Sequence, residues 1–336
     1  MPGHEKPTAV VLTEAARAAG YAPSIHNTQP WRWRVLPGGL QLFADRSRQL
    51  SATDPDGRLL TLSCGAALHH AVAALAAEGC DVAVRRLPDP ARPDLLAEVV
   101  PTGQTRVTPE AMRLVQAMRV RHTDRRPVSD EPVPPPAVAA LIQAAAGLAR
   151  LHVLDGDQVL ALAEAAYRAG EVEADDPHIR DELAYWTSRH TPRGTGLPPD
   201  VLPDRAPETT VPGRDFGPSG TLPIGPGHDR AARYALLYGD DDAPASWLRA
   251  GEALSRVWLT AVDEGVSVVP LSGAVEVTAT RESLRGVLAG LGYPYLVMRW
   301  GLPDPAGAGL PRTPRMPASQ TVDLSAAGED GTEPPA

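Results

Sequence analysis

The sequence predicts an α+β fold built from two related halves. Helical patterns and short β-rich runs are mixed along the 336 residues, and they do not alternate as a regular βαβ series would. Two segments also align without a gap at an offset of 186 residues (248 minus 62), which pairs Leu62 with Leu248 and Gly65 with Gly251. A chain of this length can hold one large domain or two small ones. We therefore expect a duplicated α+β unit.

The repeated unit is an apolar helix that ends at a glycine and is followed by a short strand. The first copy places the helix at Leu59 to Glu78 and the strand at Val82 to Val84, and the second places them at Ala245 to Glu264 and Val266 to Val269. Glycine commonly ends a helix in this way. A Leu- and Ala-rich helix before Gly and Val also arises by chance, but several identities in one register favour duplication.

The remaining elements follow from local patterns. Apolar residues at helical spacing predict a helix at Thr8 to Ala19, and the turn Pro37-Gly38-Gly39 predicts a strand pair at Trp31 to Leu36 and Leu40 to Ala44. Further helices are expected at residues 109–121, 137–146, 157–174, 176–190 and 281–291, and further strands at 150–154 and 293–300.

Proline clusters divide the chain. The cluster at 127–136 is typical of a linker, so we expect a first half at 8–126 and a second half at 127–322. Residues 186–226 are rich in Pro and Gly, which predicts a lid or a surface insertion without regular structure. Residues 323–336 are rich in Ala, Gly, Glu and Pro, which predicts a disordered tail.

The composition disfavours several classes of protein. A formal charge of −9 argues against nucleic acid as a partner. No run approaches 18 apolar residues and the N-terminus lacks the apolar core of a signal peptide, so we expect no membrane span and a cytoplasmic location. Cys64 and Cys80 are too few for a disulfide framework. The motifs HExxH, CxxC, GxGxxG and GxSxG are absent, which disfavours metal catalysis, a Rossmann site and serine-hydrolase chemistry.

A stiff polar loop, Ser24-Ile25-His26-Asn27-Thr28-Gln29, lies between Pro23 and Pro30. Because proline fixes φ and cannot donate a hydrogen bond, the segment between the two prolines is neither helix nor strand. The loop offers neutral donors and acceptors but no carboxylate or thiolate. Such a set suits a flat heterocycle better than an ion, although a helix-to-strand turn with polar caps explains the pattern equally well.

The densest positive segment is Arg121-His122-Thr123-Asp124-Arg125-Arg126. If the preceding helix extends this far, Arg121 and Arg125 share one helix face. Two guanidinium groups beside the Thr123 hydroxyl match a phosphate, whereas a solvated helix end is the alternative. Together with the polar loop, the segment suggests a mononucleotide cofactor.

These two motifs together resemble the nitroreductase superfamily of FMN proteins. In that family a Ser-x-x-Asn-x-Gln-Pro-Trp loop of one subunit meets the flavin, and an Arg-x-Ser/Thr-x-Arg segment of the other subunit holds the phosphate. The residues that match the first motif are Ser24, Asn27, Gln29 and Trp31, and those that match the second are Arg121, Thr123 and Arg125. His122 replaces the commoner arginine, and the resemblance covers about Thr8 to Val322.

The order of the motifs is reversed relative to ordinary family members, in which the arginine segment precedes the loop. The second half lacks Gln-Pro-Trp and the first half lacks an early arginine cluster. This arrangement is similar to the Acg subfamily of actinobacteria, and it implies that each half kept one side of a site that once lay between subunits. The resemblance therefore implies a nitroreductase-like fold, an intrachain pseudo-dimer with one FMN, and a monomer or weak homodimer.

The resemblance also implies which residues bind the cofactor. Ser272 and Gly273 follow the second repeated strand, where relatives touch the flavin through backbone groups. Arg315 would complete the phosphate clamp, with Arg312 as the alternative. The implied cofactor-binding residues are Ser24, Ile25, His26, Asn27, Thr28, Gln29, Arg121, Thr123, Arg125, Ser272, Gly273 and Arg315. No catalytic side chain and no metal ligand is implied.

The activity implied by the resemblance is a ping-pong reduction. NADH or NADPH would reduce the FMN, and a nitroaromatic or a quinone would then accept the electrons. The alternative is an FMN storage or sequestration protein whose lid stays closed, with Tyr185, Trp186 or Phe216 as its apolar cover. The retained arginines and the polar loop argue against a third alternative, a flavin-free interaction protein.

Overall fold

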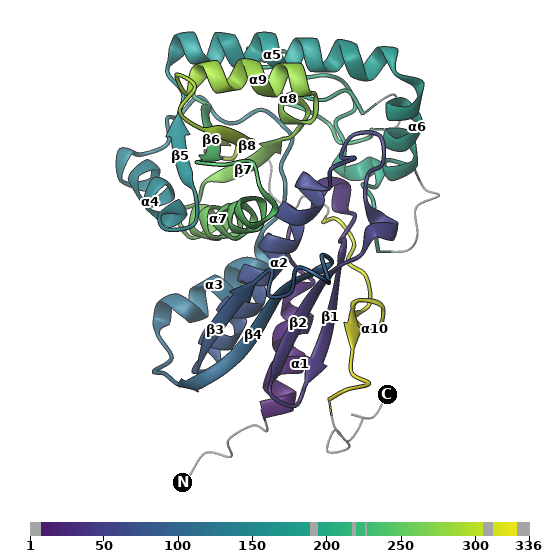
Figure 1. Ribbon diagram of the computed structural model, residues 1–336. Coiled ribbons are helices and arrows are strands. Elements are labelled where there is room, and N and C mark those ends of the chain that lie inside the picture. Colours follow the sequence, from purple (N-terminus) through teal and green to yellow (C-terminus); the bar gives the residue numbers. More distant parts are fainter. Residues whose placement is uncertain (1–7, 189–193, 217–219, 226, 305–311, 328–336) are drawn as a thin grey trace.

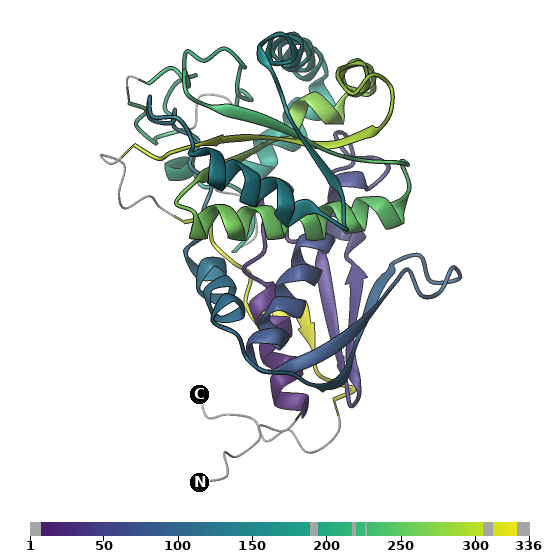
Figure 2. The same ribbon diagram turned by 90° about the vertical axis from the view of Figure 1, so that its left-hand side faces the viewer.

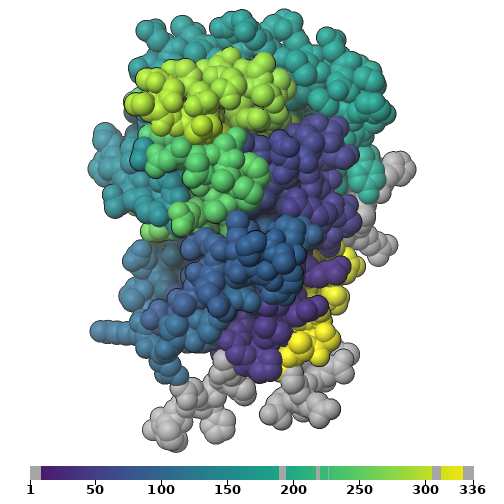
Figure 3. Space-filling view, in the orientation of Figure 1, coloured from purple at the N-terminus to yellow at the C-terminus, as the bar shows by residue number. Residues whose placement is uncertain are grey.

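The computed structural model describes residues 8–188, 194–216, 220–225, 227–304 and 312–327. Within these residues the chain forms two sheets, with helices packed between them (Figure 1). The space-filling view shows the first half of the chain, in purple and blue, against the second half, in teal and green (Figure 3). Helices of the two halves also pack directly against each other.

The first sheet has the strand order β3-β4-β2-β1-β9, in which only β9 runs parallel to its neighbour. In β1, Trp31, Trp33 and Val35 are buried and Arg32 and Arg34 are exposed, so one face of the sheet packs on helices and the other meets solvent. The strands are β1 (Trp31–Leu36), β2 (Gly39–Ala44), β3 (Cys80–Arg86), β4 (Leu95–Gln104) and β9 (Val322–Asp323), and the helices beside them are α1 (Thr8–Ala19), α2 (Arg58–Ala77) and α3 (Pro109–Val120).

The second sheet has the strand order β5-β6-β8-β7 and is antiparallel throughout. Helices α5 (Gly156–Asp175) and α9 (Thr278–Val287) cover its outer face, and α4 (Pro135–Ala145) and α7 (Pro244–Asp263) cover the face toward the first half (Figure 2). The strands are β5 (Arg150–Val153), β6 (Arg233–Gly239), β7 (Ser267–Leu271) and β8 (Tyr293–Gly301), and the shorter helices are α6 (Pro177–Trp186), α8 (Gly273–Glu276) and α10 (Ala318–Thr321).

The two sheets repeat one topology. The second sheet has the same strand order as the first sheet without β9. In this comparison the strands β1, β2, β3 and β4 correspond to β5, β6, β7 and β8. The helices correspond as well, because α1 and α4 precede the first strands while α2 and α7 connect the second and third strands. This correspondence extends well beyond the segments that align in sequence. The repeated topology is consistent with the duplicated unit expected from the sequence.

Helices α2 and α7 pack against each other in the middle of the molecule (Figure 1). A Cβ atom at Gly65 would overlap the carbonyl oxygen of Leu248, and a Cβ atom at Gly251 would overlap that of Leu62. The contacts are reciprocal because Leu62 and Leu248, like the two glycines, are equivalent in the sequence repeat. In an interface across a two-fold axis, each residue makes the same contact with the other side that its equivalent makes in return.

Helix α2 is the one described helix that is long and apolar enough to cross a membrane, and 83% of its apolar window is buried inside the protein. It packs against α1 and α7 and contributes Cys64, Leu68 and Leu75 to the core of the first half. Its burial is that of a core helix. Cys64 is fully buried, as expected for a small apolar residue in this position.

Most predicted elements are confirmed within a few residues, but several were missed. β4 and β6 were not predicted, because β4 ends in a polar stretch and contains Pro101, while β6 is a short apolar run without alternation. Helix α3 ends at Val120 and α6 at Trp186, where residues 189–190 lie outside the described part. β9 places Val322 and Asp323 against β1, so Asp323, predicted to begin a disordered tail, is in a strand, and residues 328–336 lie outside the described part.

Candidate functional site

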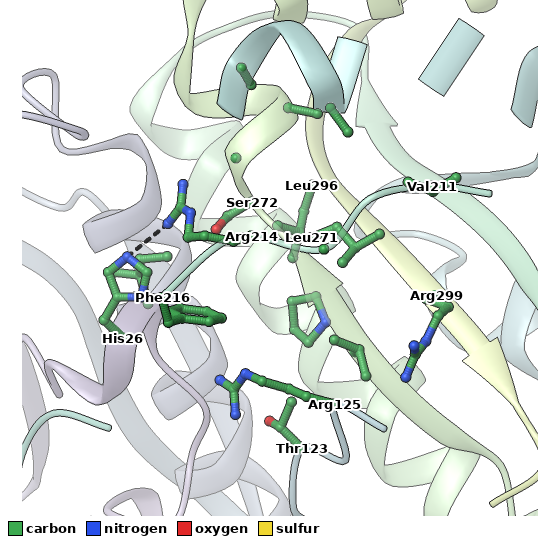
Figure 4. Close-up of a pocket in the computed structure, with 18 of the residues that line it drawn as sticks. His26, Thr123, Arg125, Val211, Arg214, Phe216, Leu271, Ser272, Leu296 and Arg299 are labelled. Atoms are coloured by element: carbon green, nitrogen blue, oxygen red, sulfur yellow. Dashed lines mark hydrogen bonds between the residues drawn. The ribbon is translucent and has the colours of Figure 1, made fainter. Parts of the chain in front are cut away.

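A cavity of about 470 Å³ lies between the two halves. The first half contributes the polar loop and the segment after α3. The second half contributes α5, the end of β7, the middle of β8, and residues 194–216, which we call the cover segment. Figure 4 shows His26, Arg214 and Ser272 on one side of this cavity and Thr123 and Arg125 on another. Of the twelve predicted binding residues, all but Thr28 and Gln29 line the cavity.

The polar loop has a strained backbone. Its centre is a single turn, Ile25–Asn27, and three of its residues have positive φ, namely His26 at 43°, Asn27 at 57° and Gln29 at 49°. Positive φ is uncommon for residues other than glycine, and such strain gathers at functional sites. Two hydroxyls fix the loop, because Ser24 Oγ accepts from the Gln29 amide at 2.9 Å and Ser63 Oγ accepts from the Ile25 amide at 3.1 Å.

The amide side chains of this loop bind protein backbone. Asn27 Nδ2 donates to the carbonyl oxygens of Gly196, at 3.1 Å, and Pro314, at 2.9 Å. Gln29 Nε2 donates to the Gly194 carbonyl, and Gln29 Oε1 accepts from the Met316 amide at 3.0 Å. These two side chains therefore join the loop to the cover segment and to the C-terminal segment, which is why Gln29 does not face the cavity. Thr28, in the same loop, is fully buried and does not line the cavity.

The segment after α3 is not helical. Because α3 ends at Val120 and Arg121 has an extended backbone (ψ 129°), the expected shared helix face of Arg121 and Arg125 is wrong. Both side chains nevertheless line the cavity together with Thr123. Arg121 Nη2 donates to the Tyr21 carbonyl and Arg125 Nη1 donates to the Val201 carbonyl of the cover segment.

Three arginines around the cavity have no carboxylate partner among the described residues: Arg121, Arg125 and Arg315. Arg121 is buried, and burial lowers its pKa; burial likewise lowers the pKa of Arg125 and of Arg315 to about 10. The Nε atoms of Arg121 and Arg315 are buried and have no hydrogen-bond partner among the described residues. Guanidinium groups stay charged in proteins, so this end of the cavity carries uncompensated positive charge.

Other charges nearby are neutralised within the protein. Arg126 forms an ion pair with Asp124 at 2.8 Å, and Arg299 forms one with Asp229 at 2.7 Å. Arg315 shares the Tyr21 carbonyl with Arg121 and also donates to Asn27 Oδ1 at 3.2 Å. Arg312 is exposed and does not line the cavity. The structure therefore places Arg315, and not Arg312, with the other arginines.

Ser272 and Gly273 lie where β7 ends and α8 begins, beside a buried ionic cluster. In this cluster the Arg214 guanidinium of the cover segment pairs with Glu173 of α5 at 2.6 Å and with Glu276 of α8. A Cβ atom at Gly273 would lie 3.0 Å from Glu173 Oε1, so a larger residue would crowd the cluster.

His26 joins the cover segment to the loop. Arg214 Nη1 lies 2.9 Å from His26 Nε2, as the dashed line in Figure 4 shows. Burial first, and then the charges of Arg214 and Arg125, hold the pKa of His26 well below its usual value. Because the guanidinium can only donate, neutral His26 accepts through Nε2 and carries its proton on Nδ1.

Phe216 is the aromatic residue of the cover. Its ring meets His26 edge-on at 6.3 Å between centroids, and the Arg125 guanidinium lies 5.3 Å from the ring centroid. Trp186 is buried and Tyr185 is exposed, and neither lines the cavity. Of the three aromatic residues considered from the sequence, Phe216 alone covers the site.

Comparison with known proteins identifies the family. No family model matches the chain. The Mycobacterium tuberculosis protein named "Putative NAD(P)H nitroreductase Rv3131" is 40% identical over 321 residues, which cover 93% of this chain and 90% of that protein. The chain belongs to the nitroreductase superfamily. A second M. tuberculosis relative, "Putative NAD(P)H nitroreductase acg", is 32% identical over 323 residues, which cover 95% of this chain and 97% of the relative, and the resemblance to Acg is thereby confirmed.

A solved structure is also similar to this nitroreductase. The FMN-dependent nitroreductase NfnB from Mycobacterium smegmatis, solved in complex with NADPH, is 16% identical and has a TM-score of 0.41. The match covers 64% of this chain and 99% of that one.

Sequence reasoning missed four residues of this nitroreductase site: Glu173, Arg214, Trp258 and Glu276. Each reaches the cavity or its ionic cluster from a different element. Arg214 and His26 are 188 residues apart, so their contact leaves no local pattern. The sequence repeat offers one signal for Trp258. The equivalent residue in the first copy of the repeated helix, 186 positions earlier, is Val72, so the tryptophan is specific to the second copy.

Proposed function

We propose that this protein binds one FMN in the cavity and uses it to reduce nitroaromatics or quinones with NADH or NADPH. The observation that carries the proposal is the group of three arginines without carboxylate partners at one end of the cavity. An anion bound there would compensate charges that the described residues leave unpaired. The names of the M. tuberculosis relatives support the nicotinamide donor.

The arginine end fits a phosphate. Arg121 and Arg315 each have a buried Nε without a partner, and a guanidinium can offer two parallel N–H groups to phosphate oxygens. Thr123 adds a hydroxyl at the same end. A dianionic phosphate would offset two of the three uncompensated positive charges at this end of the cavity.

The rest of the cavity fits a planar heterocycle. Its walls include Leu162 and Ala166 of α5 and Val269, Leu271 and Leu296 of the second sheet. Neutral His26 and the backbone at Ser272 and Gly273 supply polar groups at its edge. Apolar walls with a few fixed polar groups are the usual environment of a bound cofactor.

Bound FMN would supply the hydride chemistry, taking hydride from the nicotinamide and passing electrons to the acceptor in a ping-pong cycle. The side chains then have to bind and orient the cofactor and shield it from water. Arg121, Arg125 and Arg315 would hold the phosphate, the loop would fix the ring, and the cover segment would exclude water. We assign no catalytic side chain.

We further propose a single flavin site in each chain. The loop that carries His26 connects α1 to β1 through residues 20–30, whereas the corresponding connection of the second half, between α4 and β5, has only residues 146–149. The second half therefore has no room for an equivalent loop. Because both halves of one chain build the cavity, a monomer would be sufficient for binding.

The contacts of the cover segment favour a second candidate function, FMN storage. Arg214 binds Glu173, Glu276 and His26, while the Val201 carbonyl accepts from Arg125. A cover attached at so many points would slow the entry of a second substrate. A protein that keeps its FMN but is not reduced by NADPH or NADH would have this function.

Titration of the flavin-free protein with FMN and with riboflavin tests the phosphate assignment. The two ligands differ only in the phosphate, so we expect FMN to bind at least 100-fold more tightly, as charge-assisted hydrogen bonds of about 1.5–3 kcal/mol each would require. Equal affinities would contradict the assignment.

A further inference from the structure

We propose that Trp258 is a positioning residue that holds Arg121 in place for the phosphate of the cofactor. The Arg121 guanidinium carbon lies 4.5 Å from the centroid of the Trp258 ring, and both residues are buried, with exposed fractions of 6% and 2%. Both also line the cavity. The inference rests on the proposed function, since it concerns how the cofactor phosphate is gripped.

Arg121 has few other contacts that could fix its side chain. Among the described residues its side chain makes one hydrogen bond, from Nη2 to the Tyr21 carbonyl at 3.3 Å, which is long for this type of bond. Its Nε has no partner, and no described carboxylate pairs with it. An arginine side chain held by one weak bond would lose considerable rotamer freedom on binding a ligand. The indole removes much of that freedom in advance.

Stacking on an indole suits an arginine that must bind a phosphate. The guanidinium carbon lies over the face of the ring, and this contact uses none of the N–H groups as hydrogen-bond donors, so they stay available for a ligand. The attraction between a cation and an aromatic face is also strongest where both are shielded from water, as they are here. Trp258 thus stabilises the charge of Arg121 without consuming its donors.

The contact joins the two halves and has no counterpart. Arg121 follows α3 of the first half, and Trp258 is on α7 of the second half. The residue of α2 equivalent to Trp258 is Val72, which has no aromatic face. The aromatic support therefore exists only on the side where the arginines gather, in agreement with a single site.

The test compares FMN and riboflavin affinities of Trp258→Met and Trp258→Phe. Trp258 belongs to the hydrophobic core, so its replacement can lower the stability of the fold. A general loss of order would lower the affinities for FMN and riboflavin equally. We expect Trp258→Met to lower FMN affinity about tenfold and to leave riboflavin affinity unchanged, a loss equivalent to about 1.4 kcal/mol. Trp258→Phe keeps an aromatic face and should retain most of the FMN affinity.

The same comparison in an Arg121→Ala background shows whether Trp258 acts through Arg121. There, Trp258→Met should cause no further loss of FMN affinity. An equal loss for both ligands, or the same tenfold loss without Arg121, would overturn the proposal. If the unmodified protein binds FMN and riboflavin equally, the phosphate assignment itself is wrong, which is a different result.

Discussion

His69 Nδ1 lies 2.7 Å from Ser255 Oγ, and these two residues occupy equivalent positions in the two copies of the repeated helix. The next equivalent pair along the same helices, Gly65 and Gly251, is also in contact. Residues that touch their own counterparts mark a two-fold axis. Helices α2 and α7 therefore pack as equivalent helices do in a symmetric dimer.

The close approach of these helices predicts a large effect of small substitutions. Gly65→Ala or Gly251→Ala would place a methyl group on a backbone carbonyl of the facing helix, so we expect a loss of about 2–4 kcal/mol in the free energy of unfolding. Gly286→Ala in α9, where a Cβ atom would meet nothing, is the control and should be neutral or stabilising. Urea unfolding measures both. Equal stability of all three variants would contradict the packing.

Loss of the arginines should abolish tight cofactor binding. In Arg121→Ala with Arg125→Ala, two charged groups at the phosphate end are removed, and we expect FMN affinity to fall at least 100-fold while riboflavin affinity changes little. Arg312→Ala is the matched control, because Arg312 is near in sequence to Arg315 but exposed outside the cavity. Fluorescence titration gives both affinities. Unchanged FMN binding in the double variant would rule out the phosphate role.

Arg214 should control how readily the cover segment opens. Arg214→Ala leaves the buried carboxylates of Glu173 and Glu276 without their cation and removes the bond to His26. We expect bound FMN to dissociate at least tenfold faster and proteases to cut residues 194–216 more readily. Arg168→Ala, which removes an exposed ion pair of α5, should change neither rate. Dissociation at the original rate would show that Arg214 does not hold the cover.

Asp54 gives the protein a specific dependence on pH. Its carboxylate accepts from the amides of Leu59 and Leu60 at the start of α2, yet burial raises the pKa of Asp54 to about 6. Because this pKa exceeds the value of 3.8 for an unfolded chain, the folded state binds the proton more tightly, and this contribution to stability grows as the pH falls from 7 toward 5.

Asp54→Asn should remove that contribution. Between pH 7 and pH 5, we expect the unmodified protein to gain about 1 kcal/mol in the free energy of unfolding relative to the variant. Because both proteins share the other carboxylates, the contribution of those carboxylates to the pH dependence cancels in the difference between the two free energies of unfolding. Parallel pH profiles of the two proteins would contradict the raised pKa.

The sequence was most informative where the pattern is local. Helical periodicity located α1, α2 and α7, and the two motifs located the loop and the arginines. It was least informative where distant segments meet, as in the contacts of Arg214 and Trp258. The end of α3 was predicted within one residue, at Arg121 against the observed Val120, so the condition for a shared helix face of Arg121 and Arg125 is not met.

The visible absorption spectrum of the purified protein, recorded before and after anaerobic addition of NADPH or NADH, tests the central claim most directly. We predict a yellow protein whose flavin absorbance is bleached by the nicotinamide. A yellow protein that is not bleached would favour storage of FMN over reduction. A colourless protein that cannot be reconstituted with FMN would contradict the account.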